Sequence, residues 1–374
     1  MTTLAWKNLF HDKVRLAVTL TGIVFALILI IVQFGLFLGF LETSANVVKH
    51  SGADLWITAP GIPHVNGGAP IPEKRRYQAL AVSGVTRVDR YALNFVNWKL
   101  PGGSQEAVQI AGFDLDGKMG GPWNVVQGSV DDLRGEDTVI VDELYKEKLG
   151  INKIGDSVEV MGRRARVVGF TNGIRSFTTS PYVYTSFKNA QNYTRLEEDQ
   201  AFFLLVKLAE GTDLLKAKES LGNTLTGVEV LTNEEMWKKT QGYWVFSTGA
   251  GITTLMGAVL GLLVGIVVVA QTIYSATVDH IREFGTLKAM GARNGYIYRI
   301  IIEQAVISAV MGYTVAIFIG WFVARGSEDG NALILLPPEM ALATLGLSIL
   351  MCIIASVLSI RKATSIDPAL VFKG

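Results

Sequence analysis

The sequence predicts a membrane protein with four transmembrane α-helices and a large α+β extracytoplasmic domain inserted between helices 1 and 2. Composition is the first observation: the chain is 49% hydrophobic and only 18% charged, whereas soluble globular domains are about 25% charged. Second, four apolar stretches have the roughly 20 residues that a helix needs to cross about 30 Å of hydrocarbon. Third, residues 43–242 contain no such stretch. They are therefore expected to fold outside the membrane.

The first predicted span covers residues 16–42 and follows an amphipathic cytoplasmic segment, residues 1–15. No charged residue lies between Arg15 and Glu42. This run is too long for the core of a signal peptide, and no A-x-A cleavage site follows it. We therefore expect an uncleaved membrane anchor.

The extracytoplasmic domain, residues 43–242, has the pattern of mixed short strands and helices. Residues 156–170 alternate apolar and polar positions around a turn near Gly162, which predicts a hairpin. Other local patterns predict strands at 180–187 and 201–208, helices ending at glycines at 141–150 and 212–222, and a loop or flexible arm at the Pro/Gly-rich 59–72.

The remaining three spans are predicted at 243–278, 300–324 and 340–360. Between them lie a connection at 279–299 and a short loop at 325–339, and a tail at 361–374 follows. Lysine and arginine gather before span 1, between spans 2 and 3, and after span 4. Because cytoplasmic segments are rich in these residues, both termini are predicted to be cytoplasmic and the short loop extracytoplasmic.

Several classes of function are excluded by what the sequence lacks. A net charge of +1 without a basic run argues against nucleic-acid binding. The single cysteine, Cys352, rules out an intrachain disulfide. No catalytic or metal-ligand spacing occurs among the four histidines, so no catalytic residue, metal or bound cofactor is predicted.

The stretch GFDLDGKM, residues 112–119, matches the glycine and lysine positions of a phosphate-binding loop. It lacks the Ser or Thr that would hold Mg²⁺ and carries two aspartates where phosphates would lie. We interpret it as a polar turn. Any ATP and Mg²⁺ would then bind to another chain.

Two features of the spans suggest packing. Gly257, Gly261 and Gly265 fall on one stripe of the second span, where small residues let helices approach closely. The stripe could contact the chain's own spans or form a dimer interface. Glu303 lies near the start of the third span and is expected to pair with Arg299 rather than to conduct ions.

Residues 280–295, HIREFGTLKAMGARNG, form a charged amphipathic segment between two apolar spans. The spacing predicts a short helix with one apolar face, closed by Gly291 and Gly295. Such a helix either lies in the lipid headgroup plane or binds a cytoplasmic partner. The residues alone leave both uses open.

The stretch DHIREFGTLKAMGAR followed by IYRIIIEQ resembles the region before the third span in ABC transporter permeases of the FtsX/MacB type. The opening LAWKNLFHDKVRLAVTLTGI, the ending SIRKATSIDPALVFKG and the phrase TVIVDELYKEKLGINKIGDSVEV resemble the same family. A further resemblance to its DevC-like branch lies in IVQFGLFLGFLETS and GADLWITAP.

The resemblance implies a non-catalytic permease of the bacterial inner membrane. Its partners would be an ABC ATPase subunit that binds ATP and Mg²⁺, a second permease copy in a homodimer, and membrane lipid. The DevC-like likeness adds a periplasmic adaptor and an outer-membrane channel. Carried onto this chain, the ATPase-coupling residues are Ile281, Arg282, Glu283, Phe284, Gly285, Leu287, Lys288, Ala289, Gly291 and Ala292.

The expected function is coupling of ATP hydrolysis by the partner to movement of the periplasmic domain, for export or tripartite efflux. Almost no ionisable residue lies within the spans, which favours mechanotransmission or an apolar substrate over ion conduction. Two alternatives stay open: a mechanotransmitting regulator of a periplasmic or cell-wall partner, and a permease that extracts lipid or lipoprotein.

Overall fold

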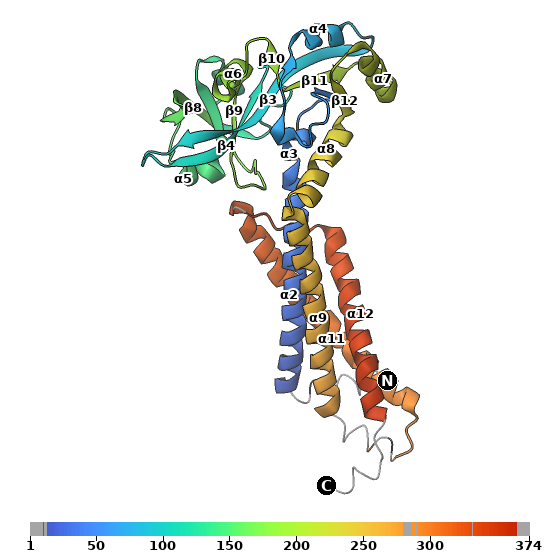
Figure 1. Cartoon of the computed structure of the whole chain (residues 1–374). Coiled ribbons are helices and arrows are strands. Elements are labelled where there is room, and N and C mark those ends of the chain that lie inside the picture. Colours follow the sequence, from blue (N-terminus) through green and yellow to red (C-terminus); the bar gives the residue numbers. More distant parts are fainter. Residues whose placement is uncertain are drawn as a thin grey trace. The chain divides into compact units, whose positions relative to one another are not determined.

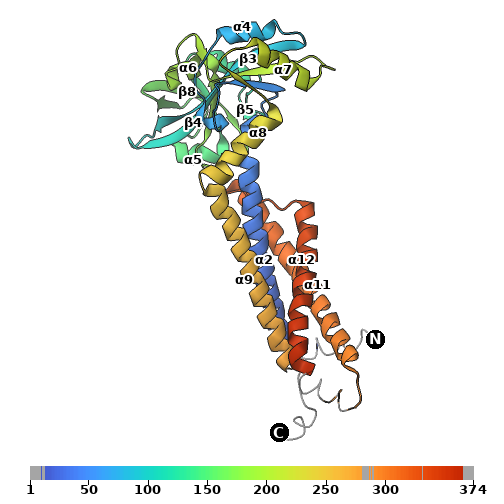
Figure 2. The ribbon, with the colours of Figure 1, turned by 45° about the vertical axis from the view of Figure 1, so that its right-hand side comes forward.

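The structure, a computed structural model, describes residues 10, 13–279, 286, 288, 290–330 and 332–364. This part of the chain divides into two compact units (Figures 1 and 2). One is a helical unit, and the other is an α+β domain that contains Phe40–Gly251. Each unit has its own core of buried apolar residues.

Four long helices make up the helical unit and confirm the predicted spans as a set. They are α2 (Lys13–Ser44), α9 (Ala250–Asp279), α11 (Asn294–Gly326) and α12 (Pro338–Thr364). Each contains a stretch long and apolar enough to cross a membrane: Leu16–Ser44, Ala250–Thr272, Asn294–Gly326 and Pro338–Val357. A 3₁₀ turn, η5 (Ser327–Asp329), follows α11.

Helix α2 contacts several other segments of the helical unit. On one side, Ile23 and Ile31 lie against two glycines of α11, Gly312 and Gly320. The loop before α12 is joined to α2 by a hydrogen bond from the backbone N–H of Leu335 to the carbonyl of Gly35 at 3.0 Å. Helices α2 and α9 run side by side in both views (Figures 1 and 2).

The start of α9 differs from the predicted start of the second span at residue 243. Tyr243–Ser247 instead forms a π-helical turn, η4, and Gly249 has a left-handed φ of 76°. Because a left-handed residue interrupts a right-handed helix, α9 begins only at Ala250.

A mixed sheet of ten strands forms the centre of the α+β domain, in the order β12-β1-β11-β3-β4-β9-β6-β8-β5, with β7 paired to β3 and β8. Strands β2 and β10 form a separate pair. The strands are β1 (Leu55–Thr58), β2 (Ile71–Pro72), β3 (Val85–Lys99), β4 (Gln105–Phe113), β5 (Val125–Gln127), β6 (Thr138–Asp142), β7 (Ser157–Val160), β8 (Arg163–Thr171), β9 (Tyr182–Ser186), β10 (Gln200–Ala201), β11 (Phe203–Leu208) and β12 (Glu229–Thr232).

Short helices cover this sheet and connect its strands. The α-helices are α3 (Asn46–Lys49), α4 (Lys74–Leu80), α5 (Lys146–Leu149), α6 (Phe187–Thr194), α7 (Leu214–Thr224) and α8 (Asn233–Gly242), and the 3₁₀ turns are η1 (Val65–Gly67), η2 (Val130–Arg134) and η3 (Glu143–Tyr145). Helix α8 begins with a capping box: Thr232 accepts from the backbone of Glu235, whose side chain accepts from the backbone of Thr232.

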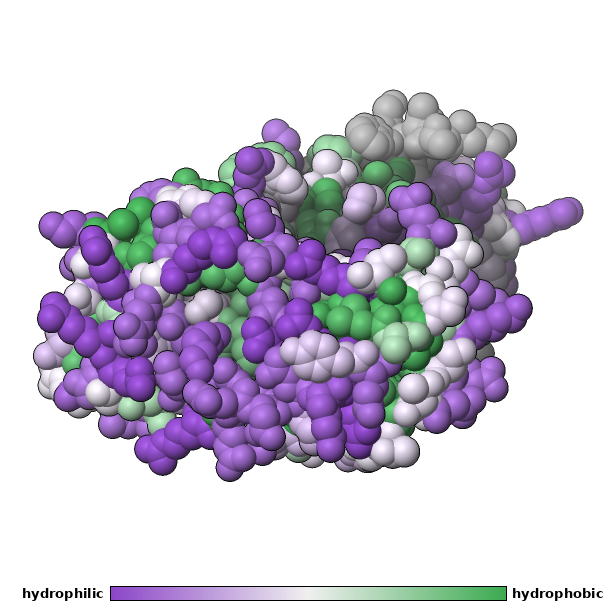
Figure 3. All heavy atoms as spheres, turned by 90° about the horizontal axis from the view of Figure 1, so that it is seen from above, coloured by the Kyte–Doolittle hydropathy of each residue, from purple (hydrophilic) through white to green (hydrophobic). Residues whose placement is uncertain are grey.

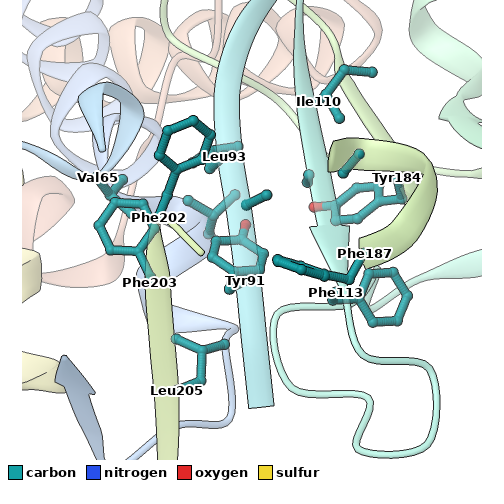
Figure 4. Packing of buried hydrophobic residues seen from close by; sticks show 14 of the residues in the cluster. Val65, Tyr91, Leu93, Ile110, Phe113, Tyr184, Phe187, Phe202, Phe203 and Leu205 are labelled. Carbon is teal, nitrogen blue, oxygen red and sulfur yellow. The ribbon is translucent and has the colours of Figure 1, made fainter. Parts of the chain in front are cut away.

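Aromatic side chains fill the core of the domain (Figure 4). Tyr91, Phe203 and Trp56 are fully buried, and the ring of Trp56 meets the other two edge to face at 5.8 and 5.6 Å. Each such pair adds about 0.5–1.5 kcal/mol beyond the burial of area. By contrast, the face of the domain in Figure 3 is mostly hydrophilic.

Local predictions within the domain are mostly confirmed. Strands β7 and β8 form the expected hairpin, and its two-residue turn, Met161-Gly162, has positive φ at both positions, as a type I′ turn requires. Strands β9 and β11 lie within the stretches predicted for them.

Two local predictions need correction. Residues 141 and 142 end strand β6, so helical structure at 141–150 begins only with η3. Helix α7 runs past Gly222 to Thr224, because an αR glycine is permitted inside a helix. The segment 59–72 was expected to be a loop or a flexible arm, and the structure shows the loop: Ile62, Val65 and Ile71 are buried in the core.

Candidate functional site

The predicted ATPase-coupling segment lies between α9 and α11. Ile281, Arg282, Glu283, Phe284, Gly285, Leu287 and Ala289 lie outside the described residues. Within the described part, the backbone N–H of Met290 donates to the carbonyl of Thr286 at 3.0 Å, and that of Gly291 donates to Lys288 at 3.0 Å. The first bond has the i to i−4 spacing of a helical turn.

Gly291 has a left-handed φ of 92°, the conformation that commonly closes a helix at its C-terminus. The prediction that Gly295 also closes this helix is wrong, because Gly295 lies in the first turn of α11. Met290 is 71% exposed, and the next residues, Ala292 and Arg293, lead directly into α11. An apolar side chain is thus available to a partner or to lipid beside the segment.

The glycine stripe of α9 faces α2 of the same chain. A Cβ on Gly257 would lie 2.9 Å from Oε1 of Gln33, one on Gly261 would lie 3.2 Å from Cγ of Gln33, and one on Gly265 would lie 3.0 Å from Cδ1 of Ile30. The small residues let the two helices approach closely. The stripe packs within the chain in this structure.

Two polar contacts between α11 and α12 were not predicted from the sequence. The hydroxyl of Tyr313 donates to the carbonyl of Ala341 at 3.0 Å, and that of Ser348 donates to Ala309 at 3.2 Å. Such residues are common in spans, so their pattern alone did not indicate a contact. The predicted pair of Arg299 with Glu303 is present, with Nε and Oε1 2.9 Å apart.

The stretch that resembles a phosphate-binding loop is a polar turn, as predicted. Its Asp114 carboxylate accepts hydrogen bonds from Arg90 at 2.7–3.3 Å, and Asp116 accepts one from Arg134 at 2.9 Å. Gly117 packs on the buried Asp89, whose carboxylate leaves no room for a Cβ. Two carboxylates, each paired with an arginine, therefore stand where a phosphate would have to lie.

Five aromatic rings meet where α2 enters and α8 leaves the α+β domain. We call this cluster the aromatic junction; its members are Phe40, His64, Phe177, Tyr243 and Trp244. The centroid of the Trp244 ring lies 4.5 Å from that of Phe177 and 5.0 Å from that of His64. The Tyr243 ring lies 4.2 Å from His64, and Phe40 meets Phe177 at 5.2 Å.

A chain of hydrogen bonds leads from the aromatic junction into the sheet. The indole N–H of Trp244 donates to Oδ1 of Asn66 at 3.3 Å, and the amide of Asn66 donates to Oε1 of Gln109. Gln109 in turn donates to Oγ of Ser176 at 2.7 Å. Each hydrogen bond in this series fixes the orientation of a buried amide group. The series therefore holds the aromatic junction in one arrangement.

Burial in the junction lowers the pKa of His64, and its Nδ1 has no hydrogen-bond partner. The π-helical turn that carries Tyr243 and Trp244 is a form found frequently at functional sites. Sequence reasoning missed the junction. The available signal was an aromatic run directly before an apolar span, which is typical of a membrane interface.

No group of three or more possible metal ligands occurs within the described residues. Each unit has its own candidate features: a helical turn before α11 and a close α2–α9 contact in the helical unit, and the aromatic junction in the α+β domain.

Two parts of the chain match known protein families. Residues 16–224 match the MacB-like periplasmic core domain, and residues 255–368 match the FtsX-like permease C-terminal domain. Because the first match alone covers more than half of the chain, the protein belongs to the family of FtsX/MacB-type ABC transporter permeases. It is a multi-pass membrane protein and a permease subunit.

Relatives carry the same description. An ABC transporter permease of Mycobacterium tuberculosis is 22% identical over 99% of both chains. One of Methanocaldococcus jannaschii is 24% identical over 47% of this chain and 45% of its own.

Solved structures give more distant likenesses. The periplasmic region of MacB from Actinobacillus actinomycetemcomitans is 15% identical, with a TM-score of 0.39, over 49% of this chain and 91% of that one. The extracellular domain of the transporter YknZ from Gram-positive bacteria is 14% identical, with a TM-score of 0.36, over 48% and 99%.

Proposed function

We propose that this permease couples ATP hydrolysis by a separate ABC ATPase subunit to movement of its α+β domain, for export or tripartite efflux. One observation carries the proposal: a single chain joins a MacB-like core domain to an FtsX-like permease region. The carboxylates of Asp114 and Asp116, both paired with arginines, also support a nucleotide site on another chain.

The segment before α11 is the proposed docking element. Its glycine-terminated helical turn and exposed Met290 offer a short helix end with an apolar side chain. A helix of this kind binds in a hydrophobic groove of a partner. The arginines and Lys288 of the segment would add charge-assisted contacts.

The aromatic junction is the proposed point of transmission within the α+β domain. The last turn of α2 carries Phe40, and the turn before α9 carries Tyr243 and Trp244. Movement of either span would therefore act on the same aromatic cluster. The hydrogen-bond chain through Asn66 and Gln109 would pass the displacement to the sheet.

The proposal includes a place in the bacterial inner membrane with both termini cytoplasmic. It also includes a homodimer, and a periplasmic adaptor with an outer-membrane channel. Support for the orientation comes from charge. Lys288 and Arg293 lie between α9 and α11, and Arg299 lies near the start of α11. The segment 325–339 carries one arginine against Glu328, Asp329 and Glu339.

Orientation is tested by labelling introduced cysteines in intact cells. The only native cysteine, Cys352, is buried and is replaced by alanine. A membrane-impermeant maleimide should label Leu215→Cys in α7, and should label Met290→Cys only after the membrane is opened. Labelling of Met290→Cys in intact cells would reverse the proposed topology.

Coupling is tested by co-purification from native membranes in mild detergent, with bound proteins identified by mass spectrometry. The variant is Phe284→Asp with Leu287→Asp, which places charge on the predicted apolar face. The matched control is Leu215→Asp, the same change at an exposed site of α7. An ATPase bound to wild type and control but lost from the variant supports coupling. Equal binding to all three refutes docking through this segment.

A further inference from the structure

Arg175 lies in the loop of residues 172–181 between β8 and β9, and its side chain is buried although it is charged. Only 8% of its surface is exposed. Its Nε has no hydrogen-bond partner. Across the described ranges, no carboxylate lies within ion-pair distance of this guanidinium. A buried N–H without a partner is unfavourable, and native proteins rarely keep one.

An acidic side chain on an adjoining strand is already occupied by other donors. Asp142, at the end of β6, accepts hydrogen bonds from the backbone of Leu144 at 3.1 Å, from Oγ1 of Thr171 at 2.8 Å and from the backbone of Ile174 at 2.7 Å. These three donors stabilise a carboxylate without the help of arginine. Asp142 therefore anchors the loop and leaves Arg175 without a counter-ion.

The residues on either side of Arg175 are held in place. The bond from Ile174 to Asp142 fixes one side, and the backbone N–H of Ser176 faces the hydroxyl of Tyr145 at 3.4 Å. Further along, the ammonium of Lys148 donates to the carbonyl of Thr179 at 2.6 Å. The guanidinium thus starts from a fixed backbone, which lowers the entropy lost on binding a ligand.

The same loop touches the end of a membrane span. Phe177, two residues after Arg175, packs edge to face against Phe40 of α2, and Phe40 lies in the candidate span Leu16–Ser44. Phe177 also contacts Trp244 of the aromatic junction. Aromatic rings at a span end are typical of the level of lipid headgroups. Phosphate is the anion that is abundant at this level.

We propose that Arg175 is the anchoring cation of a phosphate-binding site at the end of α2, and that its ligand is the phosphate of a membrane phospholipid. Planar guanidinium binds phosphate oxygens through two parallel hydrogen bonds, for which a fixed arginine is well suited. Free inorganic phosphate offers the same chemistry, and the test separates the two sources.

The test uses the full chain in detergent and follows its thermal unfolding as ligand is added. The ligands are dioctanoyl-phosphatidylglycerol, inorganic phosphate, and dioctanoylglycerol, which has the acyl chains but no phosphate. The variants are Arg175→Met, which keeps the length of the side chain, and Arg175→Lys, which keeps its charge. The matched control is Arg164→Met, at an exposed arginine of β8.

We expect the phospholipid, but not dioctanoylglycerol, to raise the unfolding temperature of wild type and control. Arg175→Met should bind the phospholipid about tenfold more weakly or worse, the loss expected from removing a charge-assisted hydrogen bond. The affinity of Arg175→Lys for the phospholipid should lie between those of wild type and Arg175→Met. Without ligand, Arg175→Met should be at least as stable as wild type, because it removes a buried N–H that has no hydrogen-bond partner.

Other outcomes are equally decisive. Stabilisation by inorganic phosphate at similar concentrations, lost in Arg175→Met, would support the site with free phosphate as its source. Equal stabilisation by dioctanoylglycerol, or an unchanged response of Arg175→Met, would overturn the proposal. So would an Arg175→Met protein that is less stable without ligand and keeps its ligand response, since Arg175 would then have only a structural role.

Discussion

Gly312 of α11 lies against Ile23 of α2 so closely that a Cβ on the glycine would stand 2.5 Å from Cγ2 and 3.1 Å from Cβ of the isoleucine. The Cβ of Ile23 is fixed to its helix and cannot turn away. Contact between α2 and α11 therefore depends on the missing side chain at this position.

This relationship predicts that Gly312→Ala destabilises the helical unit. Pushing α11 from α2 should cost about 1–3 kcal/mol, the usual effect of overpacking. The measurement is the thermal unfolding midpoint of the full chain in detergent. Gly346→Ala in α12 is the control, because nothing lies within 4 Å of a Cβ there. It should leave the midpoint unchanged or raise it, and a fall of equal size in both variants would contradict the prediction.

The aromatic junction predicts two effects of different size at Trp244. Trp244→Ala removes a large half-buried ring and should destabilise the α+β domain by about 3 kcal/mol. Trp244→Phe keeps an aromatic ring but removes the donor to Asn66 and should cost about 1 kcal/mol. Denaturant unfolding measures both. Phe246→Ala, at a ring that is 69% exposed, should have little effect, and a loss like that of Trp244→Ala would argue against the junction.

Stability should also depend on pH through His64. Because burial lowers the pKa of His64 in the folded protein below its ordinary value of 6.5, the unfolded chain holds the proton more tightly. The free energy of unfolding therefore contains a contribution that is present above pH 6.5 and is lost as pH falls through the lowered pKa.

The measurement is the unfolding midpoint between about pH 5 and pH 7.5, the range in which histidine titrates. His64→Gln should flatten the loss of stability on acidification. His50→Gln, which changes an exposed histidine, should keep the wild-type slope. If the slopes of wild type and His64→Gln coincide, titration of His64 does not control stability in this range.

The positive φ of Gly291 gives a prediction for the coupling segment. Gly291→Ala forces a Cβ into the left-handed region at φ 92°, at a cost of about 1–2 kcal/mol. The segment should then be misdirected, and less ATPase should co-purify. Gly295→Ala lies in regular helix with open space around it and should retain the ATPase. Equal retention by both variants would mean that the glycine turn is not needed for docking.

The sequence predicted what is local. Apolar runs of span length predicted the four helices, and the alternation on both sides of a turn near Gly162-Arg163 predicted the β7–β8 hairpin, because both signals lie within a few neighbouring residues. The turn itself lies one residue earlier, at Met161-Gly162. The order of the strands in the sheet could not be predicted from the sequence. Strand β1 pairs with β11 and β12, strands that follow it by most of the length of the domain, and no local pattern encodes such a pairing.

The functional features divide in the same way. The glycine spacing on α9 showed a packing stripe but not that α2 faces it. Arg175 stands in a hydroxyl-rich loop sequence, TNGIRSFTTS, that is typical of an exposed segment, so its burial could not be foreseen. The aromatic junction joins residues from four separate segments and becomes visible only in three dimensions.

The first and last strands of the α+β domain, β1 and β12, lie side by side. Strand β1 follows α2 after the short helix α3, and strand β12 directly precedes α8. The two strands are paired along β1 from Leu55 to Thr58. The indole of Trp56 also donates to Asn233 at 2.9 Å. A domain whose entrance and exit coincide can be inserted into, or removed from, a chain without pulling its flanking helices apart. The architecture is therefore modular: one membrane bundle can carry different external domains while keeping its own connectivity.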